Sequence, residues 1–171
     1  MKVIGSVFII GATTLLGCRI AIDMDSAYGE LKYIRQILYM LQSEIRYSRS
    51  FLGEAFMEIS KTAREPYGAW MRQLSYRMEH KNSGTFDKMW RETIQEYLID
   101  LKIPAQELKR LKDLGQYLGS ADTQMQVRHI ELFEEQLETT MKEMKEGLHT
   151  KKRLCHCLGV MSGILLAILL I

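Results

Sequence analysis

Apolar residues recur every three or four positions through most of the chain, which is the spacing of one face of an amphipathic α-helix. The clearest stripe predicts a helix from about Ala27 to Tyr47, with the members Leu31, Ile34, Leu38, Leu41 and Ile45. Five further stripes begin at Leu52, Tyr67, Phe86, Leu108 and Ile130. Since no segment alternates with a period of two, the pattern predicts an all-α fold, a six-helix bundle within residues 24–150.

Proline and glycine predict where several of these helices begin and end. Pro66 disfavours helical geometry in the residue before it, so the second helix is expected to end upstream of it. Pro104 breaks the chain and suits the start of the fifth helix, which Gly119 is expected to end. Ser120 or Asp122 is expected to cap the sixth helix, which is then predicted to continue toward the C-terminus.

An apolar segment stands on each side of this helical domain. Residues 3–18 carry no charge, and residues 154–171 carry no formally charged side chain. As helices, residues 154–171 would reach about 27 Å, and residues 3–22 about 30 Å if Arg19 snorkels to the headgroups, close to the roughly 30 Å hydrocarbon thickness of a bilayer. The sequence therefore predicts transmembrane helices at residues 1–22 and 154–171.

The basic residues beside these segments predict an orientation. Arg19, Lys151, Lys152 and Arg153 lie on the side of the helical domain, whereas Lys2 lies on the terminal side. Because loops rich in Lys and Arg stay in the cytoplasm, the helical domain is expected there, with both termini outside. All three cysteines lie in or beside the apolar segments, so the helical domain cannot contain a disulfide, as suits a reducing compartment.

Small residues in the apolar segments are candidates for close helix packing. Gly159 and Gly163 form a G-x-x-x-G motif, while Thr13, Gly17 and Ala21 place a small residue at every fourth position. Such stripes let two helix backbones approach closely, either between the two spans or between subunits. Glycine is also common in membrane helices generally, so the motif alone is weak.

The sequence contains no pattern that predicts catalysis or cofactor binding. Phosphate-binding loops, dinucleotide-binding glycine motifs, H-E-x-x-H and C-x-x-C are all absent, and no small-molecule substrate is expected. The Cys155-His156-Cys157 cluster is not expected to bind a metal, because two residues of separation point the thiols to nearly opposite faces of a helix. His80, His129 and His149 are isolated and are interpreted as surface or cap residues. Near balance of acidic and basic residues in the helical domain argues against nucleic-acid binding.

Acidic residues on the predicted sixth helix mark a candidate partner face. The candidates are Glu131, Glu135 and Glu138, and Glu134 lies among them. A run of charges on a long helix is usually a solvated face, and this one is interpreted as solvated and available to a partner. Basic residues of opposite sign are expected near one end of the bundle: Arg46, Arg49, Arg72, Arg77 and Lys81.

A competing interpretation begins at Cys18. Leu15-Leu16-Gly17-Cys18 follows Lys2 and an apolar stretch, as in the processing site of a bacterial lipoprotein. Processing there would make Cys18 a lipid-modified first residue and place the domain outside the cytoplasm. Against it stand the bulky Leu16, Arg19 directly after the cysteine, and a second apolar segment that a lipid anchor does not need.

Short motifs along essentially the whole chain resemble one family of proteins. The motif residues are Gly5, Val7-Phe8, Ala12-Thr13-Thr14, Gly17, Leu41, Glu44-Ile45, Tyr47, Leu111, Leu114-Gly115, Leu118-Gly119, Asp122, Gln126 and His129-Ile130. In order and spacing they resemble the stage III sporulation protein AB family. Two features depart from the family pattern: Phe51 stands where a proline is expected, and the Cys-His-Cys cluster is not a family feature.

The resemblance implies a fold and a role. The middle domain is expected to be similar to the cytoplasmic F domain of type II secretion and type IV pilus platform proteins. The implied function is a structural membrane platform in the sporulation channel between mother cell and forespore. Its implied partners are a secretion-type ATPase and other membrane subunits of the channel, in the mother-cell membrane around the forespore. No catalysis is implied, and the number of copies is left open, with a homo-oligomer among the options.

Overall fold

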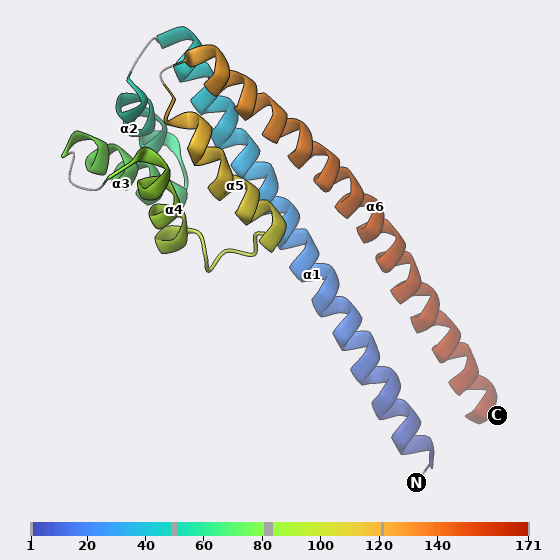
Figure 1. Cartoon of the computed structure of the whole chain (residues 1–171). Coiled ribbons are helices and arrows are strands. Elements are labelled where there is room, and N and C mark those ends of the chain that lie inside the picture. Colours follow the sequence, from blue (N-terminus) through green and yellow to red (C-terminus); the bar gives the residue numbers. More distant parts are fainter. Residues whose placement is uncertain (1, 49–50, 81–83, 121, 171) are drawn as a thin grey trace. The chain divides into compact units, whose positions relative to one another are not determined.

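In the computed structural model, the regular elements of the described residues are all helices (Figure 1). The backbone is described for residues 2–48, 51–80, 84–120 and 122–170, and the side chains for residues 19, 22–47, 51–80, 84–120 and 122–147. The elements are α1 (Lys2–Ser43), a π-helical turn η1 (Glu44–Ser48), α2 (Leu52–Thr62), α3 (Tyr67–Glu79), α4 (Phe86–Tyr97), α5 (Ala105–Leu118) and α6 (Thr123–Leu170). The predicted all-α, six-helix fold is confirmed.

The chain divides into two compact units. One unit is Glu30–Thr139, which is called the bundle below, and the other combines Met1–Gly29 with Thr140–Ile171. The bundle contains the C-terminal part of α1, the whole of α2 to α5, and the N-terminal part of α6. It lies inside the domain predicted at residues 24–150, whose boundaries stay a prediction.

The first and last helices are longer than a bundle of this size needs. The sequence predicts a first span at 1–22 and a separate helix from Ala27, whereas α1 is one helix from Lys2 to Ser43. Asp23-Met24-Asp25-Ser26 joins the two predicted segments without proline or glycine, so nothing in it stops the helix. α6 likewise continues to Leu170, as predicted.

The predicted membrane spans fall mostly on residues whose side chains lie outside the described set. Among the residues whose side chains are described, no helix is both long enough and apolar enough to cross a membrane.

The predicted apolar stripes form the core of the bundle. The stripe of α1 and η1, from Leu31 to Ile45, is buried to 6% exposure or less at each of its five positions. Leu108, Leu111, Leu114 and Leu118 of α5 are also buried, as are Ile130, Phe133 and Leu137 of α6. Removing each of these apolar side chains from water stabilises the fold by about 1.5–3 kcal/mol. This burial is the main force that holds the helices together.

Aromatic side chains dominate the core between α2, α3 and α4. The rings of Trp70 and Trp90 lie 4.9 Å apart at 54°, and the ring of Phe56 lies 6.1 Å from that of Trp90. Both indole N–H groups are buried and bonded: Trp70 Nε1 donates to Thr93 Oγ1 at 3.1 Å, and Trp90 Nε1 donates to the Leu111 carbonyl at 2.7 Å. A buried indole without such an acceptor would be costly, so these bonds also select the helix register.

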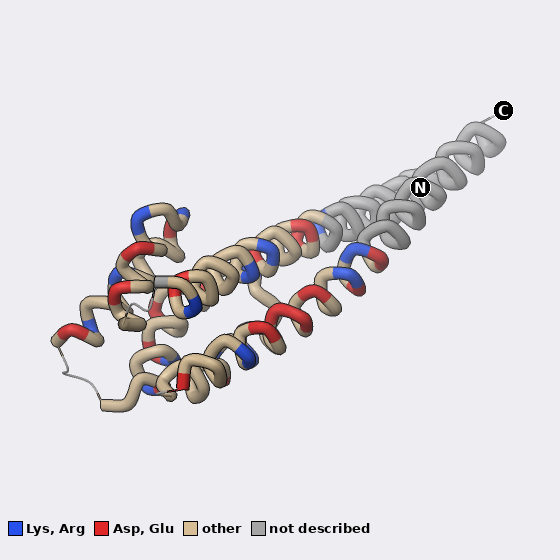
Figure 2. The backbone as a smooth tube through the Cα atoms, turned by 90° about the horizontal axis from the view of Figure 1, so that it is seen from above, with Lys and Arg blue, Asp and Glu red and all other residues tan. Residues whose placement is uncertain are grey.

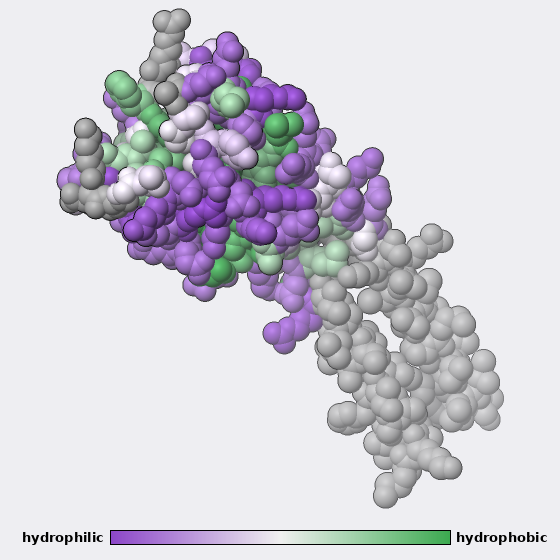
Figure 3. All heavy atoms as spheres, in the orientation of Figure 1, coloured by the Kyte–Doolittle hydropathy of each residue, from purple (hydrophilic) through white to green (hydrophobic). Residues whose placement is uncertain are grey.

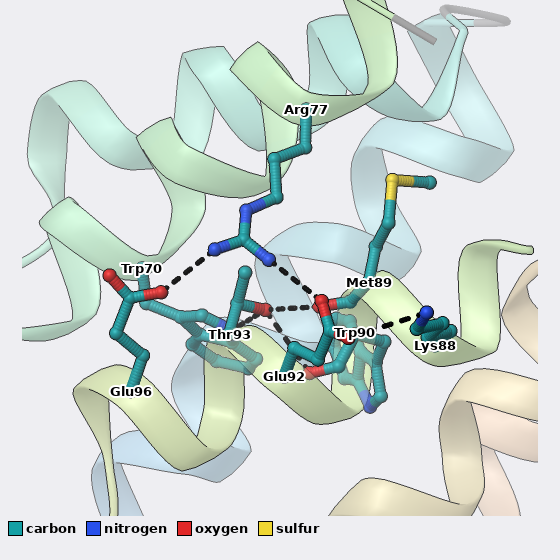
Figure 4. Close-up of polar contacts among 8 residues, drawn as sticks. All are labelled: Trp70, Arg77, Lys88, Met89, Trp90, Glu92, Thr93 and Glu96. Carbon is teal, nitrogen blue, oxygen red and sulfur yellow. Dashed lines mark hydrogen bonds and ion pairs between the residues drawn. The ribbon is translucent and has the colours of Figure 1, made fainter. Parts of the chain in front are cut away.

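An arginine clamp joins α3 to α4 at the edge of this core (Figure 4). Arg77 Nη1 donates to Glu92 Oε2 at 3.1 Å and its Nη2 donates to Glu96 Oε2 at 2.8 Å. Because Glu92 and Glu96 are four residues apart, they lie on one face of α4 and both reach the guanidinium.

Glycine makes the close contact between α4 and α5. A Cβ at Gly115 would overlap the Trp90 indole at Cδ1 and Cγ, and a Cβ at Gly119 would stand 3.0 Å from Cβ of Phe86. Glycine at both positions lets α5 lie directly against the aromatic residues of α4.

Helix ends follow the predicted signals with small shifts. α2 ends upstream of Pro66, α5 begins directly after Pro104, and Gly119 is its C-cap. Asp122 caps α6 through its Oδ1, which accepts from the Gln124 backbone N–H at 2.9 Å. α4 begins at Phe86, where its predicted stripe begins, and ends at Tyr97.

Candidate interaction surfaces

Two polar surfaces of the bundle involve α6. The first, called the seam below, is where α6 meets α1 and η1, and the second, called the groove, lies between α5 and α6. Seen as spheres, the outer face of the bundle is mostly hydrophilic with separate hydrophobic patches (Figure 3).

The seam is built from arginine and glutamate. Arg46 Nη2 and Gln42 Nε2 both donate to Glu131 Oε1, at 2.8 and 2.9 Å, and Arg35 Nη2 donates to Glu138 Oε2 at 3.0 Å. The helices are antiparallel here, because the later residue of α1 pairs with the earlier residue of α6. Acidic residues recur along this part of α6 (Figure 2).

Glu134 lies between the two paired glutamates of α6 and has a different environment. It is half-buried, and among the described residues its buried Oε1 has no hydrogen-bond partner. Burial raises the pKa of Glu134 above its ordinary value; the Arg35 charge lowers it and the Glu131 charge adds to the rise. The seam therefore holds three carboxylates, Glu131, Glu134 and Glu138; Arg35 and Arg46 approach them from α1 and η1, and Arg128 of α6 lies 3.7 Å from Glu131 Oε2.

The candidate partner face thus has more than one environment. Glu131 and Glu138 have partners within the chain, on η1 and α1, while Glu135 is exposed and its backbone carbonyl accepts from Thr139 Oγ1 at 3.0 Å. That this face binds a partner stays a prediction. Glu135 is the candidate residue that takes no part in the ion pairs of the seam.

Three of the five basic residues that were expected near one end of the bundle have partners within the chain. Arg46 belongs to the seam, Arg72 pairs with Glu65 at 2.6 Å, and Arg77 is the clamp between α3 and α4. The Arg72 guanidinium holds the pKa of the Glu65 carboxyl below its ordinary value. Arg49 and Lys81 lie outside the described residues.

The groove combines an apolar floor with a polar rim. It encloses about 230 Å³ and is lined by Arg110, Asp113, Tyr117, His129, Phe133 and Gln136, among others. The His129 imidazole stacks on the Tyr117 ring, with centroids 3.6 Å apart and planes at 14°. Arg110 pairs with Glu107, and Asp113 pairs with Arg91, so the rim charges are neutralised locally. His80, in contrast, lies at the exposed C-cap of α3, as predicted.

One further polar cluster was not predicted from the sequence. Glu30 Oε2 accepts from Tyr67 Oη and from Arg64 Nη2, both at 2.7 Å, and the Arg64 guanidinium lies 4.3 Å from the centre of the Tyr33 ring. Burial, followed by the Glu30 carboxylate, raises the pKa of the Tyr67 hydroxyl. The residues come from α1, α3 and the loop before α3, so no local pattern joins them.

The remaining candidates fall outside the described side chains. Thr13, Gly17, Ala21, Gly159 and Gly163 belong to this group, as do the lipoprotein motif at Cys18 and the Cys155-His156-Cys157 cluster. Their predicted roles stay predictions. Among the described residues, no group of His, Cys, Asp and Glu could hold a metal ion.

Comparison with known proteins identifies the family. Residues 2–171 match the family described as stage III sporulation protein AB. The chain belongs to the stage III sporulation protein AB family. The predicted resemblance is thereby confirmed, and the family is a sporulation family whose name indicates no catalytic activity.

Two members illustrate the relationship. The chain is 27% identical over 170 residues to stage III sporulation protein AB of Bacillus subtilis (strain 168), and the alignment covers 99% of each chain. It is also similar to the solved structure of stage III sporulation protein AB (SpoIIIAB), with a TM-score of 0.64 and 22% identity. That likeness covers 72% of this chain and 97% of the solved one, and it concerns the fold.

The structure gives physical roles to the motif between Leu111 and Ile130 that resembles the stage III sporulation protein AB family. Leu111, Leu114, Leu118 and Ile130 are buried, and Gly115 and Gly119 lie against Trp90 and Phe86. The Gln126 side-chain amide donates to the Leu118 and Ser120 carbonyls at the end of α5, while Asp122 caps α6. The motif therefore sets how α5 turns into α6, which is also what forms the groove.

Proposed function

We propose that this chain is a structural membrane subunit of a stage III sporulation channel whose cytoplasmic bundle docks a secretion-type ATPase. Membership of the sporulation protein AB family over residues 2–171 is the observation that carries the proposal. Two apolar segments in the sequence support anchorage of the chain by a helix at each end. The sequence has no phosphate-binding loop, so hydrolysis would come from the partner.

Membrane topology is the first test of this proposal. Thr85 suits a single reporter cysteine, because it is exposed and its side chain forms no capping bond at the start of α4. In a chain with Cys18, Cys155 and Cys157 replaced, Thr85→Cys is expected to react with a membrane-impermeant maleimide only after cells are permeabilised. Labelling in intact cells would overturn the cytoplasmic placement and favour a lipoprotein processed at Cys18.

Docking of the ATPase is tested by charge reversal on α6. A triple reversal of Glu131, Glu135 and Glu138 would also break the seam, so lost binding could reflect lost structure. Glu135→Lys changes the exposed position alone and is expected to weaken co-purification of the ATPase roughly tenfold if this face docks it, which corresponds to about 1.4 kcal/mol. The matched control is Glu54→Lys on α2, another exposed glutamate of the bundle. Equal binding by both variants and the unaltered chain would exclude the α6 face.

A further inference from the structure

One of the three carboxylates in the seam between α1 and α6 has no hydrogen-bonded partner among the described residues. Arg35 pairs with Glu138, and Arg46, Gln42 and Arg128 all serve Glu131, whereas the buried Oε1 of Glu134, between them on the same face of α6, has none. Residues 131, 134 and 138 are spaced by three and four, so the three carboxylates lie on adjacent turns of one face. Like charges at this spacing repel each other, and a half-buried one cannot be screened fully by solvent.

The surroundings of Glu134 make it the carboxylate of the seam that responds to a change of pH. Its Oε1 is buried and lacks a hydrogen-bond partner among the described residues, whereas the carboxylates on either side of it are bonded across the seam. The charged groups that act on it are Arg35 from α1, whose attraction it shares with Glu138, and Glu131 from α6 itself. A neutral carboxyl in this position would lose the repulsion and could be buried at lower cost.

We infer that the seam is a proton-sensitive joint that tightens when Glu134 takes up a proton and loosens when Glu134 is charged. The direction follows from the sign of the electrostatic effect. The folded-state pKa of Glu134 is raised, so its contribution to stability is fully present below its ordinary pKa of 4.5. This contribution is lost as the pH rises through the raised pKa. At a pH above the raised pKa the joint is therefore in its weaker state, and this inference does not depend on the proposed docking of an ATPase.

Glu134→Gln tests the joint, because glutamine keeps the shape of the side chain and removes the charge. In the full chain in lipid nanodiscs at pH 7.5, this variant is expected to raise the melting temperature by about 1–4 °C. The gain is expected to shrink toward zero as the pH falls through the raised pKa toward the ordinary one, since the unaltered chain then becomes neutral at this position. Glu135→Gln, at the exposed neighbouring position, is the matched control and is expected to shift the melting temperature by less than about 1 °C at every pH.

Two further measurements separate a joint from a general gain in stability. Hydrogen exchange at pH 7.5 is expected to slow at least threefold in residues 30–47 and 125–139 of the Glu134→Gln variant, with little change in α3 and α4. The gain from Glu134→Gln is also expected to grow in an Arg35→Gln background, where the attraction that offsets the Glu134 charge is gone. A Glu134→Gln variant that is no more stable than the unaltered chain, or equally more stable at all pH values, would overturn the inference.

Discussion

The core between α2 and α5 and the seam between α1 and α6 hold the bundle together by different means. In the core, Trp70, Trp90 and Phe56 pack ring against ring, and both indole N–H groups donate to buried acceptors. In the seam, half-exposed arginines and glutamates meet across two helices, and one carboxylate oxygen has no partner among the described residues.

The difference between these regions lies in what each can tolerate. A close-packed aromatic core responds to changes of volume, because neighbouring side chains have no room to shift. Half-exposed ion pairs respond to charge, salt and pH, and each contributes little alone. The core therefore determines the fold, while the seam can change its strength without loss of the fold.

Removing the central indole should produce the largest effect. Trp90 is fully buried, contacts Trp70, Phe56 and Phe86, and donates a hydrogen bond to Leu111. Trp90→Ala is expected to reduce the free energy of unfolding by about 3–5 kcal/mol, measured by denaturant titration of the full chain in detergent. Tyr39→Ala, at a side chain with 66% exposure, should change it by less than about 0.5 kcal/mol. A loss below about 1 kcal/mol at Trp90 would show that the core does not dominate.

Adding a single methyl group at the α4–α5 contact should have the next largest effect. Alanine favours a helix over glycine by about 1 kcal/mol, but the Cβ of Gly115→Ala would overlap the Trp90 indole, so a net loss of about 1–3 kcal/mol is expected. Gly29→Ala is the control, because a Cβ at this helical position meets no atom within 4 Å. This control should raise stability by up to about 1 kcal/mol. Equal effects at both glycines in the same titration would contradict the close contact.

The sequence predicted the core well and the seam poorly, for a physical reason. Periodicity located the buried stripes, because a helix repeats its face every three or four residues whatever it packs against. It could not show that Gly115 faces Trp90, since they come from different helices. The partners of Glu131 and Glu138 are 85 and 103 positions away, so their acidic run could only be interpreted as a solvated face.

The course of α1 near Asp23 shows a second limit of what a hydrophobic pattern can predict. The change from an apolar to an amphipathic pattern near Asp23 set the end of the predicted span at residue 22, but a change of pattern reports a change of surroundings and not of backbone. Because no residue there prevents helical geometry, α1 runs through it from Lys2 to Ser43.

The smallest expected effect distinguishes ion pairs in the seam from ion pairs elsewhere on the surface. Arg46 and Glu131 are 46% and 34% exposed, whereas Lys61 and Glu58 of α2 are 59% and 57% exposed. A double-mutant cycle with glutamine replacements at Arg46 and Glu131 is expected to give a coupling of about 0.5–1 kcal/mol, against about 0.2–0.5 kcal/mol for Lys61 and Glu58.

The salt dependence of the coupling energy tests whether the coupling arises from attraction between the charges. Partial burial limits screening, so raising the salt concentration to about 1 M should reduce the seam coupling by a smaller fraction than the α2 coupling. Equal couplings that vanish together in salt would mean that the seam behaves as ordinary surface. The contrast with the core would then be one of burial alone, because the Arg46–Glu131 pair would contribute no more than an exposed pair within a single helix.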